Sequence, residues 1–299
     1  MVLLHRLGQL PANVRPQLTV AHLNHGLRKS ESDADQRLVS SICDQWHLPF
    51  VTKTLDSDQI ANTQQQTIEE AARSIRYRWL EETAQKTGAT AIVTGHHADD
   101  QAETVAHHLV RGTGLRGLQG MLPVRTLPTG IRLLRPLLGF SRKQLRNYAS
   151  FQQIAFREDA TNVDTAFTRN KIRHDLIPQI NSENQADVTQ SLTQLAASAA
   201  DTVQVLDEIC QELATAAFVT CTSSHVLIAV QPFANLPDLI QSHFFTWLWI
   251  QQAWPRQKMT SAHWQRLSAA VRGSAPLRFQ LPGRVDVTRE RQWMRLVSR

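Results

Sequence analysis

The sequence predicts an α/β domain built on a parallel sheet, followed by a long helix and a small α+β domain. Short β-branched runs alternate with amphipathic stretches through the first half of the 299 residues. This alternation is typical of a parallel sheet covered by helices on both faces. From about residue 186 the chain turns to Ala, Leu, Val, Gln, Ser and Thr with helical spacing. We therefore expect three parts, at 1–185, 186–217 and 218–299.

The first part divides into alternating elements. Strands are expected at 17–22, 49–55 and 91–95, and helices at 32–46, 67–86 and 99–111. Ser32 and Thr67 suit N-caps of the first two helices, and Gly88 suits the end of the second. Ligands of such sheets bind beyond the carboxyl ends of the strands. The loops at 22–28 and 94–100 are therefore the expected site.

The rest of the chain has a different pattern. We expect a strand at 131–138, a helix capped by Ser141, and a helix at 168–177 that ends before Pro178. Residues 218–299 hold five of the seven tryptophans and strand-like pieces such as 226–230. We interpret these tryptophans as core side chains, with a base-stacking platform as the alternative.

The charge distribution favours a polyanionic partner. The net charge is +6 and the pI about 9.6. Residues 104–157 contain no Asp or Glu but carry Arg111, Arg116, Arg125, Arg132, Arg135, Arg142, Lys143, Arg146 and Arg157. An all-positive segment gains most from nucleic acid. The alternative is a solvated face balanced by acidic residues elsewhere in the fold.

Composition also excludes several classes of protein. No apolar run approaches the length of a membrane span, and Arg6 interrupts the apolar start, so no signal peptide is indicated. The three cysteines are far apart and form no CxxC pair. This spacing argues against a disulfide framework and a zinc ribbon, and the simplest setting is a reducing cytoplasm.

The stretch TGHHADDQAETV, at 94–105, concentrates titratable side chains at one expected site loop. Asp100 and Glu103 are three residues apart and share one helical face. Such a pair holds a cation, either Mg²⁺ or an organic ammonium such as a lysine side chain. Two alternatives remain: His96, His97 and Asp99 as metal ligands, or Asp99 as a helix cap with the histidines in supporting hydrogen bonds. No HExxH spacing is present.

Basic motifs surround this loop in the sequence. Arg76 lies on the preceding helix with Glu69, and ordinary salt bridges between helical neighbours are the alternative role for it. RGTGLRG at 111–117 places three glycines between two arginines, an arrangement that suits a phosphate or an RNA strand. TRNKIRH at 168–174 is compatible with RNA backbone, a phosphate or solvent.

Taken together and in this order, these motifs resemble the tRNA(Ile)-lysidine synthase family. The matching stretches are VAHLNHGLR (20–28), ESDAD (31–35), IEEAARSIRYRWL (68–80), TGHHADDQAET (94–104), RGTGLRGLQGM (111–121), RPLLGFSR (135–142), EDATNVD (158–164) and TRNKIRHDLIP (168–178). The resemblance is close over about residues 1–185 and holds only in outline beyond.

The resemblance implies an N-type ATP pyrophosphatase domain of the PP-loop superfamily, with an adenine nucleotide alpha hydrolase-like fold. Such an enzyme uses ATP and Mg²⁺ to adenylate C2 of the wobble cytidine of the CAU-anticodon isoleucine tRNA. Free lysine then displaces AMP and forms lysidine, which changes decoding from AUG to AUA. A homodimer would suit an enzyme that spans a tRNA.

The resemblance also assigns roles to residues of this chain. It implies catalytic roles for Asp100, Glu103 and Arg76, with the two carboxylates binding the lysine ammonium groups. ATP binding is implied for His22, Asn24, His25, Gly95 and His96. Binding of tRNA is implied for Arg111, Arg116, Arg135, Arg142, Arg169, Asn170 and Arg173. No metal-ligating side chain is assigned.

The sequence departs from the family pattern at its start. The family's SGGxDS loop, whose backbone N–H groups cradle pyrophosphate, is absent, and MVLLHRL resembles the helix that follows it. We therefore expect the domain to lack its first strand and, as given, to be inactive or poorly folded. Two explanations are open: the start codon is assigned too late, or the protein is a truncated pseudoenzyme. The alternatives are a non-catalytic tRNA-binding protein and a related tRNA thiolase, whose chemistry calls for cysteines placed unlike Cys43, Cys210 and Cys221.

Overall fold

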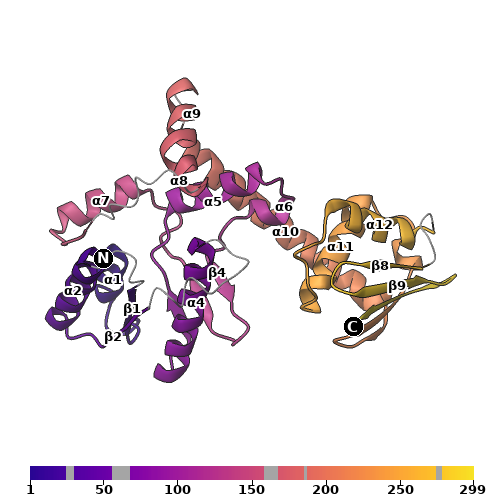
Figure 1. Cartoon of the computed structure of the whole chain (residues 1–299), viewed down its shortest axis with the longest axis horizontal. Helices are drawn as coiled ribbons and strands as arrows, with labels where there is room; N and C mark the ends of the chain where they lie inside the picture. The colour runs from indigo at the N-terminus through magenta and orange to yellow at the C-terminus, as the bar shows by residue number, and fades with distance from the viewer. Residues whose placement is uncertain (25–29, 56–67, 158–167, 185–186, 274–277) are drawn as a thin grey trace. The chain divides into compact units, whose positions relative to one another are not determined.

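The computed structural model describes residues 1–24, 30–55, 68–157, 168–184, 187–273 and 278–299. The chain divides into two compact units, Met1–Ala197 and Ser198–Arg299 (Figure 1). The first unit mixes helices with parallel strands, and this mixture confirms the predicted α/β class. No helix among the described residues has both the length and the apolar character to span a membrane.

The first unit contains, in chain order, α1 Val2–Gly8, β1 Val20–Asn24, α2 Ser30–Gln45, β2 Phe50–Thr54, α4 Ile68–Thr87, β3 Ala91–Val93, α5 Ala98–Val110, α6 Leu115–Leu118, β4 Val124–Thr126, β5 Arg132–Leu134, α7 Arg142–Phe151, α8 Thr168–Lys171, the π-helix η2 Ile172–Leu176 and α9 Ile177–Asn184. Helix α10, Val188–Ala217, begins in this unit and continues into the second.

The strands of the first unit form two separate sheets in the part of the chain that the structure describes. Strand β1 pairs with β2 in parallel, from Val20 opposite Phe50 to Asn24 opposite Thr54. Strand β3 pairs in parallel with β5, and β5 pairs antiparallel with β4. Helix α4 packs against both β1 and β3. The carboxyl ends of β1 and β3 are therefore held in one unit, although no described strand joins their sheets.

Several elements differ from the sequence prediction, among them β4 and the helix near Pro178. Strand β4 was not expected, because its three residues are all exposed and show no buried-face alternation. The helix expected to end before Pro178 continues instead through the π-helix η2 into α9. Proline is tolerated in the first turn of a helix, where its missing N–H has no intrahelical partner. A new α-helical segment starts at Ile177, so Pro178 lies in such a turn.

A small apolar cluster connects the elements that carry the site. Ala102 and Ala106 of α5 pack with Ile172 of η2 and Ile177 of α9, and Leu192 of α10 covers them. The small alanine side chains allow close approach of the helix backbones. Polar residues of α5 and η2 are thereby brought within reach of each other.

The second unit is an antiparallel sheet covered by helices. Its further elements are β6 Phe218–Cys221, β7 His225–Ala229, the 3₁₀-helix η3 Gln231–Phe233, α11 Asp238–Gln251, α12 Ser261–Val271, β8 Arg278–Leu281, β9 Val285–Arg289 and β10 Trp293–Ser298. The strand order is β6-β7-β10-β9-β8. Phe233, Phe244, Phe245 and Trp249 are fully buried in one core.

Most tryptophans of this unit are core side chains, as the sequence analysis interpreted them. Trp249 and Trp254 are buried, and Trp247 and Trp264 pack against the same cluster. Trp249 meets both Trp254 and Trp264 edge to face, with ring centroids 4.9 and 5.4 Å apart. Trp293 differs, because 37% of it is exposed.

Candidate active site on helix α5

The N-terminus of α5 is organised by a capping box. His97 is the N-cap residue, and its backbone N–H donates to Oδ2 of Asp100 at 3.0 Å. A carboxylate at this position also gains from the helix dipole. The interpretation of Asp99 as the cap of α5 is wrong, since the helix begins earlier, at Ala98. Asp100 is therefore fixed in orientation by the backbone next to it.

Asp99 serves a different helix. Its Oδ2 accepts a hydrogen bond of 2.7 Å from the backbone N–H of Arg142, the first residue of α7. Burial alone would raise the pKa of Asp99, but the nearby His97 side chain, with Nδ1 3.5 Å from Oδ2, and the hydrogen bond from the Arg142 N–H outweigh it, so the pKa lies below its usual value. Asp99 thus ties the start of α7 to the start of α5.

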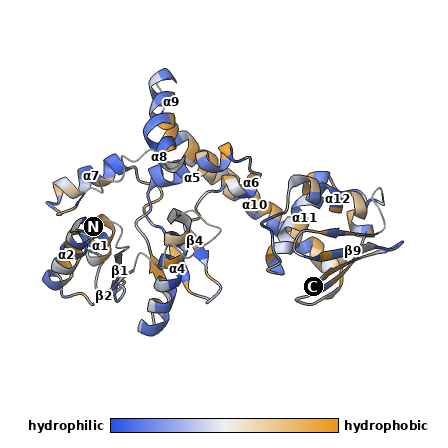
Figure 2. Cartoon of the chain, in the orientation of Figure 1, coloured by the Kyte–Doolittle hydropathy of each residue, from blue (hydrophilic) through white to orange (hydrophobic). Residues whose placement is uncertain are grey.

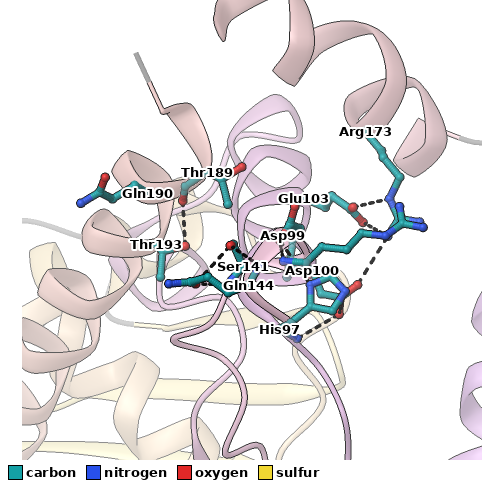
Figure 3. Close-up of polar contacts among 12 residues, drawn as sticks. His97, Asp99, Asp100, Glu103, Ser141, Gln144, Arg173, Thr189, Gln190 and Thr193 are labelled. Atoms are coloured by element: carbon teal, nitrogen blue, oxygen red, sulfur yellow. Dashed lines mark hydrogen bonds and ion pairs between the residues drawn. The ribbon is translucent and has the colours of Figure 1, made fainter. Parts of the chain in front are cut away.

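Glu103 and Arg173 form the central ion pair of the site (Figure 3). Glu103 is only 1% exposed. Arg173 Nε donates to its Oε1, and Nη2 donates to Oε2 at 3.0 Å. The same Nη2 lies 3.5 Å from Oδ1 of Asp100. A planar guanidinium matches a carboxylate in this two-bond arrangement. Arg173 therefore faces both carboxylates on α5.

The surroundings keep Arg173 charged. Burial alone would lower the pKa of Arg173, but the hydrogen bond and charge of Glu103, with the charges of Asp100 and Asp99, raise it above its usual value. Arg173 lies in the π-helix η2. π-helical turns are rare in proteins, and those that occur are often found at functional sites. Sequence analysis grouped Arg173 with tRNA-binding residues and gave no signal that it pairs with carboxylates 70 positions earlier.

Gln101 fixes the loop opposite α5. Its side-chain amide donates to the carbonyls of Gln119 and Met121, at 2.9 and 3.1 Å, and its Oε1 accepts from the Met121 N–H at 2.7 Å. Gln101 is buried, so these three bonds satisfy a polar group that burial would otherwise destabilise. The RGTGLRG motif consequently leads into a loop that is held against α5.

Among the residues assigned to ATP, His22 and Asn24 lie on β1, and Gly95 and His96 follow the end of β3. Burial lowers the pKa of His22. The charge of Asp35 opposes this shift and the charge of Arg76 adds to it, so the pKa lies below its usual value. Asn24 is buried, and its amide donates to Asp33 and Gln36, at 3.0 and 3.2 Å. Asn24 therefore orders α2 in this structure.

Two further ATP assignments lie just after β3, and one cannot be placed. Gly95 is exposed, and a Cβ added to it would meet no atom within 4 Å. Nδ1 of His96 is 2.9 Å from Oγ1 of Thr94. His25 lies outside the described residues.

The residues assigned to tRNA differ in exposure. Arg111 is exposed, whereas Arg116, Arg142 and Asn170 are half-buried, and the Arg169 side chain lies outside the described residues. Arg135 differs from the others: it is only 5% exposed, and its Nη1 donates to the Leu122 carbonyl at 2.7 Å. Its Nε is buried and has no hydrogen-bond partner among the described residues. Of the nine cations in 104–157, those exposed are Arg111, Arg125, Arg132, Lys143, Arg146 and Arg157.

Among the described residues, no three His, Cys, Asp or Glu side chains are arranged to hold a metal ion. Carboxylates and a guanidinium in one place instead suit a ligand that carries both an amine and negative charge. An amine binds carboxylates, and phosphate oxygens bind a guanidinium. The geometry at α5 can therefore bring a nucleophilic amine next to a phosphorylated centre.

Comparison with known proteins identifies the fold and the family. A family model described as the PP-loop domain matches residues 1–180. Proteins named tRNA(Ile)-lysidine synthase match at 34% identity in Rhodopirellula baltica, over 85% of this chain and 68% of that relative, and at 38% in Lactiplantibacillus plantarum, over 83% and 53%. The Geobacter sulfurreducens protein of the same name is 38% identical over 67% of this chain and 41% of its own length.

The chain spans about half the length of most of these relatives. Among solved structures, the U34-tRNA thiolase NcsA from Methanococcus maripaludis, with its [4Fe-4S] cluster, has a similar fold, with a TM-score of 0.53 and 14% identity. The match covers 66% of this chain and 67% of that one. The PP-loop match and the extent of the Rhodopirellula alignment together show that this chain belongs to the tRNA(Ile)-lysidine synthase family.

Proposed function

We propose that the protein ligates lysine to C2 of the wobble cytidine of a CAU-anticodon isoleucine tRNA, with ATP and through an adenylated cytidine. The observation that carries this proposal is the placement of Asp100, Glu103 and Arg173 together at the start of α5, within a PP-loop domain. Two carboxylates suit the ammonium groups of lysine, and a guanidinium suits the phosphate that is displaced.

Asp100 and Glu103 have different parts in this proposal. The Asp100 side chain is 16% exposed and that of Glu103 only 2%. An incoming ammonium therefore meets Asp100 first. Glu103 holds Arg173 by two hydrogen bonds, so an ammonium that reaches Glu103 competes with the guanidinium. Asp100 orients the amine, and Glu103 positions Arg173 while adding negative charge to the same region.

The second step forms a bond between the lysine amine and C2, and it requires the amine to lose a proton and AMP to leave from C2. A carboxylate within hydrogen-bond reach orients the nucleophile and assists removal of its proton. Arg173 and Arg76 would stabilise the negative charge that develops on the departing phosphate. The effect of Arg76 on the pKa of His22 supports its place at the nucleotide end of β1.

ATP fits the residues at the strand ends. His22, with its lowered pKa, is a neutral hydrogen-bonding group at pH 7, and Gly95 leaves its backbone open to a ligand. His96 adds a second imidazole at the end of β3. We propose that these residues hold the nucleotide. Mg²⁺ would be bound mainly by the phosphate oxygens, as is usual for this ion, and would neutralise the pyrophosphate charge.

Further parts of the proposal concern the rest of the protein and its setting. We propose that 1–185 is the catalytic domain, 186–217 a connecting helix and 218–299 a tRNA-binding domain. A reducing cytoplasm and a homodimer complete the proposal. Cys43 and Cys210 are completely buried, and the exposed Cys221 lies on β6 of the second unit, so no accessible cysteine is among the described residues of the PP-loop domain; this supports lysine ligation over a thiolase chemistry that requires accessible sulfur there.

Pyrophosphate release tests the proposed function. Protein expressed from the complete reading frame, supplied with ATP and Mg²⁺, should release pyrophosphate when the CAU-anticodon isoleucine tRNA is added, and should release AMP when lysine is added as well. An isoleucine tRNA with a GAU anticodon is the matched control. Release that is independent of tRNA, or absent in its presence, would contradict the proposal.

A further inference from the structure

One face of α7 exposes an unusual set of side chains. Lys143, Arg146, Asn147 and Phe151 follow helical spacing and are all exposed, and 82% of Phe151 is open to solvent. The opposite face packs on the first helix: Tyr148 Oη lies 2.9 Å from Nδ1 of His5. The helix is therefore anchored on one side and presents cations and an aromatic ring on the other. Figure 2 shows its mostly hydrophilic character.

Exposed phenylalanines are concentrated here. Among the described residues, the phenylalanines with large exposure are Phe140, Phe151 and Phe156, at 50%, 82% and 42%. Single exposed apolar residues are common, but three aromatic rings within one short segment indicate a binding surface. No Asp or Glu lies between residues 104 and 157, so these rings are interleaved with positive charge only.

The α7 segment starts at the candidate active site. The carbonyl of Phe140 accepts a hydrogen bond of 2.9 Å from the Ala98 N–H, at the start of α5. The Arg142 N–H donates to Asp99. From there the ten residues of α7 extend about 15 Å. A chain of nucleotides whose reacting base lies beside Asp100 can therefore continue along α7.

We propose that the α7 surface, formed by Phe140, Lys143, Arg146, Asn147 and Phe151, binds the unpaired nucleotides that flank the reacting base. The phenylalanine rings stack on bases, and the cations contact the phosphates. Proteins recognise single-stranded RNA loops by this combination of aromatic stacking and positive charge. The inference rests on the proposed function and specifies which part of the RNA the surface receives.

The charge of the surface favours RNA over a second copy of this chain. In a twofold dimer the same patch faces itself. Lys143 and Arg146 of one copy would then lie near those of the other, and like charges in contact weaken association. A polyanion removes this repulsion. RNA is therefore the occupant whose charge complements the α7 surface.

Variants of Phe151 distinguish stacking from plain apolar contact. Binding of the full chain to a fluorescent RNA hairpin with a CAU loop is measured by anisotropy. Phe151→Ala and Phe151→Leu should each weaken the Kd about tenfold or more, because loss of one base–aromatic stack has an effect of this order. Phe151→Trp should bind at least as tightly as the native protein. Val205→Ala, at an exposed apolar position of the connecting helix α10, should leave the Kd unchanged.

Native-like binding by Phe151→Leu would overturn the proposal, since leucine keeps apolar area but cannot stack. A change from dimer to monomer in Phe151→Ala by light scattering, with an unchanged Kd for RNA, would assign the surface to self-association and also overturn it.

Charge reversal tests the phosphate contacts. Lys143→Glu with Arg146→Glu should reduce the slope of log Kd against log salt by about 1.4, since each phosphate contact to a single strand contributes about 0.7. Lys53→Glu with Lys86→Glu, at two exposed lysines of the first unit, is the control at equal charge change and should shift the slope less. Equal slopes in the two double variants would contradict the proposal.

These binding assays contain neither ATP nor lysine, so they are independent of ligation. If the native protein ligates no lysine but the α7 variants still weaken binding, only the proposed function fails. If lysine is ligated but the α7 variants bind normally, only the α7 surface fails.

Discussion

Asp100 and Glu103 show how environment separates two carboxylates on one helical face. Oδ2 of Asp100 is fixed by the backbone N–H of His97, and its side chain keeps contact with solvent. Glu103 is buried against Arg173. The first can exchange its partner for an incoming ammonium at small cost, whereas release of the second would leave a buried charge. In the proposed lysine transfer, the two residues therefore have different roles.

A double-mutant cycle tests the pairing of Glu103 with Arg173. Removal of one partner of a buried pair costs about 3–5 kcal/mol; since Arg173 is 23% exposed, we expect a loss of about 2 kcal/mol for Glu103→Ala. The double variant with Arg173→Ala should lose less than the sum of the single variants by at least about 1 kcal/mol. Urea unfolding measures all three, with Glu82→Ala as an exposed control. Strictly additive losses would show that the pair contributes no coupling.

The titration of His22 tests its proximity to Arg76. Its folded-state pKa lies below 6.5, mainly because burial disfavours the charged imidazole. Protonation therefore opposes folding, and the free energy of unfolding should fall as the pH drops from 6.5 through the lower folded pKa. Arg76→Ala should raise the NMR titration midpoint, and Asp35→Asn should lower it further. A His22 titration midpoint at pH 6.5 or above that is the same in both variants as in the native protein would place His22 away from these charges.

At the residue scale, the sequence predicts what neighbouring positions share and misses what the fold brings together. The spacing of Asp100 and Glu103 was enough to place them on one face. The approach of Arg173 depends on packing of η2 against α5, and the burial of Arg135 depends on the carbonyl of Leu122. Local spacing carries no information on such contacts, and Arg135 looks in sequence like any exposed arginine.

At the element scale, α5 depends on the loop that follows it. Gly120 has φ +58°, and a Cβ added there would lie 2.7 Å from Oε1 of Gln101. The side chain of Gln101 cannot move away without losing its bonds to Gln119 and Met121. The loop and helix are therefore matched to each other through a residue without a side chain.

Gly120→Ala should consequently destabilise the protein. The left-handed backbone costs about 1–2 kcal/mol for a residue with a Cβ, and displacement of Gln101 adds part of its hydrogen-bond energy, so we expect a total of about 2 kcal/mol. Gly139→Ala is the matched control, because its added Cβ meets no atom within 4 Å. Thermal unfolding measures both. An equal melting temperature for the two variants would contradict the role of Gly120.

Element positions followed from the sequence where periodicity was long, and failed where it was short. Helix α10 and the N-cap Ser141 of α7 agree with the expectation within a few residues. Strand β4 has only three residues and no buried face. The π-helix η2 arises because the chain must continue from α8 into a segment with proline in its first turn. A π-helical turn has no distinctive sequence period.

At the scale of the whole molecule, the two units differ in the kinds of side chain that they bury. The second unit has one large aromatic core around Phe233, Phe244 and Trp249. The first unit has several smaller clusters and a larger number of charged and polar side chains in its interior, Glu103 and Arg135 among them. Buried polar groups need complete hydrogen bonding. The first unit thus buries polar groups at a cost in folding free energy, and their hydrogen bonds fix these groups in position, as an active site requires.

A change in composition near residue 186 predicts the order of these parts, and motifs spread over 20–178 indicate the family. The alternation of elements predicts one parallel sheet, whereas the described strands of the first unit form two sheets linked through α4. Periodicity identifies a strand but not its partner. Pairing therefore required the structure.

Transfer of radiolabelled lysine to the CAU-anticodon isoleucine tRNA tests the central claim most directly. Protein from the complete reading frame, with ATP and Mg²⁺, should attach label to this tRNA, and Asp100→Asn should reduce attachment by at least about 100-fold, the scale typical of general acid–base and positioning groups, while the Kd for tRNA changes little. Equal loss of transfer and tRNA affinity in Asp100→Asn would make Asp100 a structural residue. Absence of labelled tRNA with the native protein would contradict lysine ligation itself.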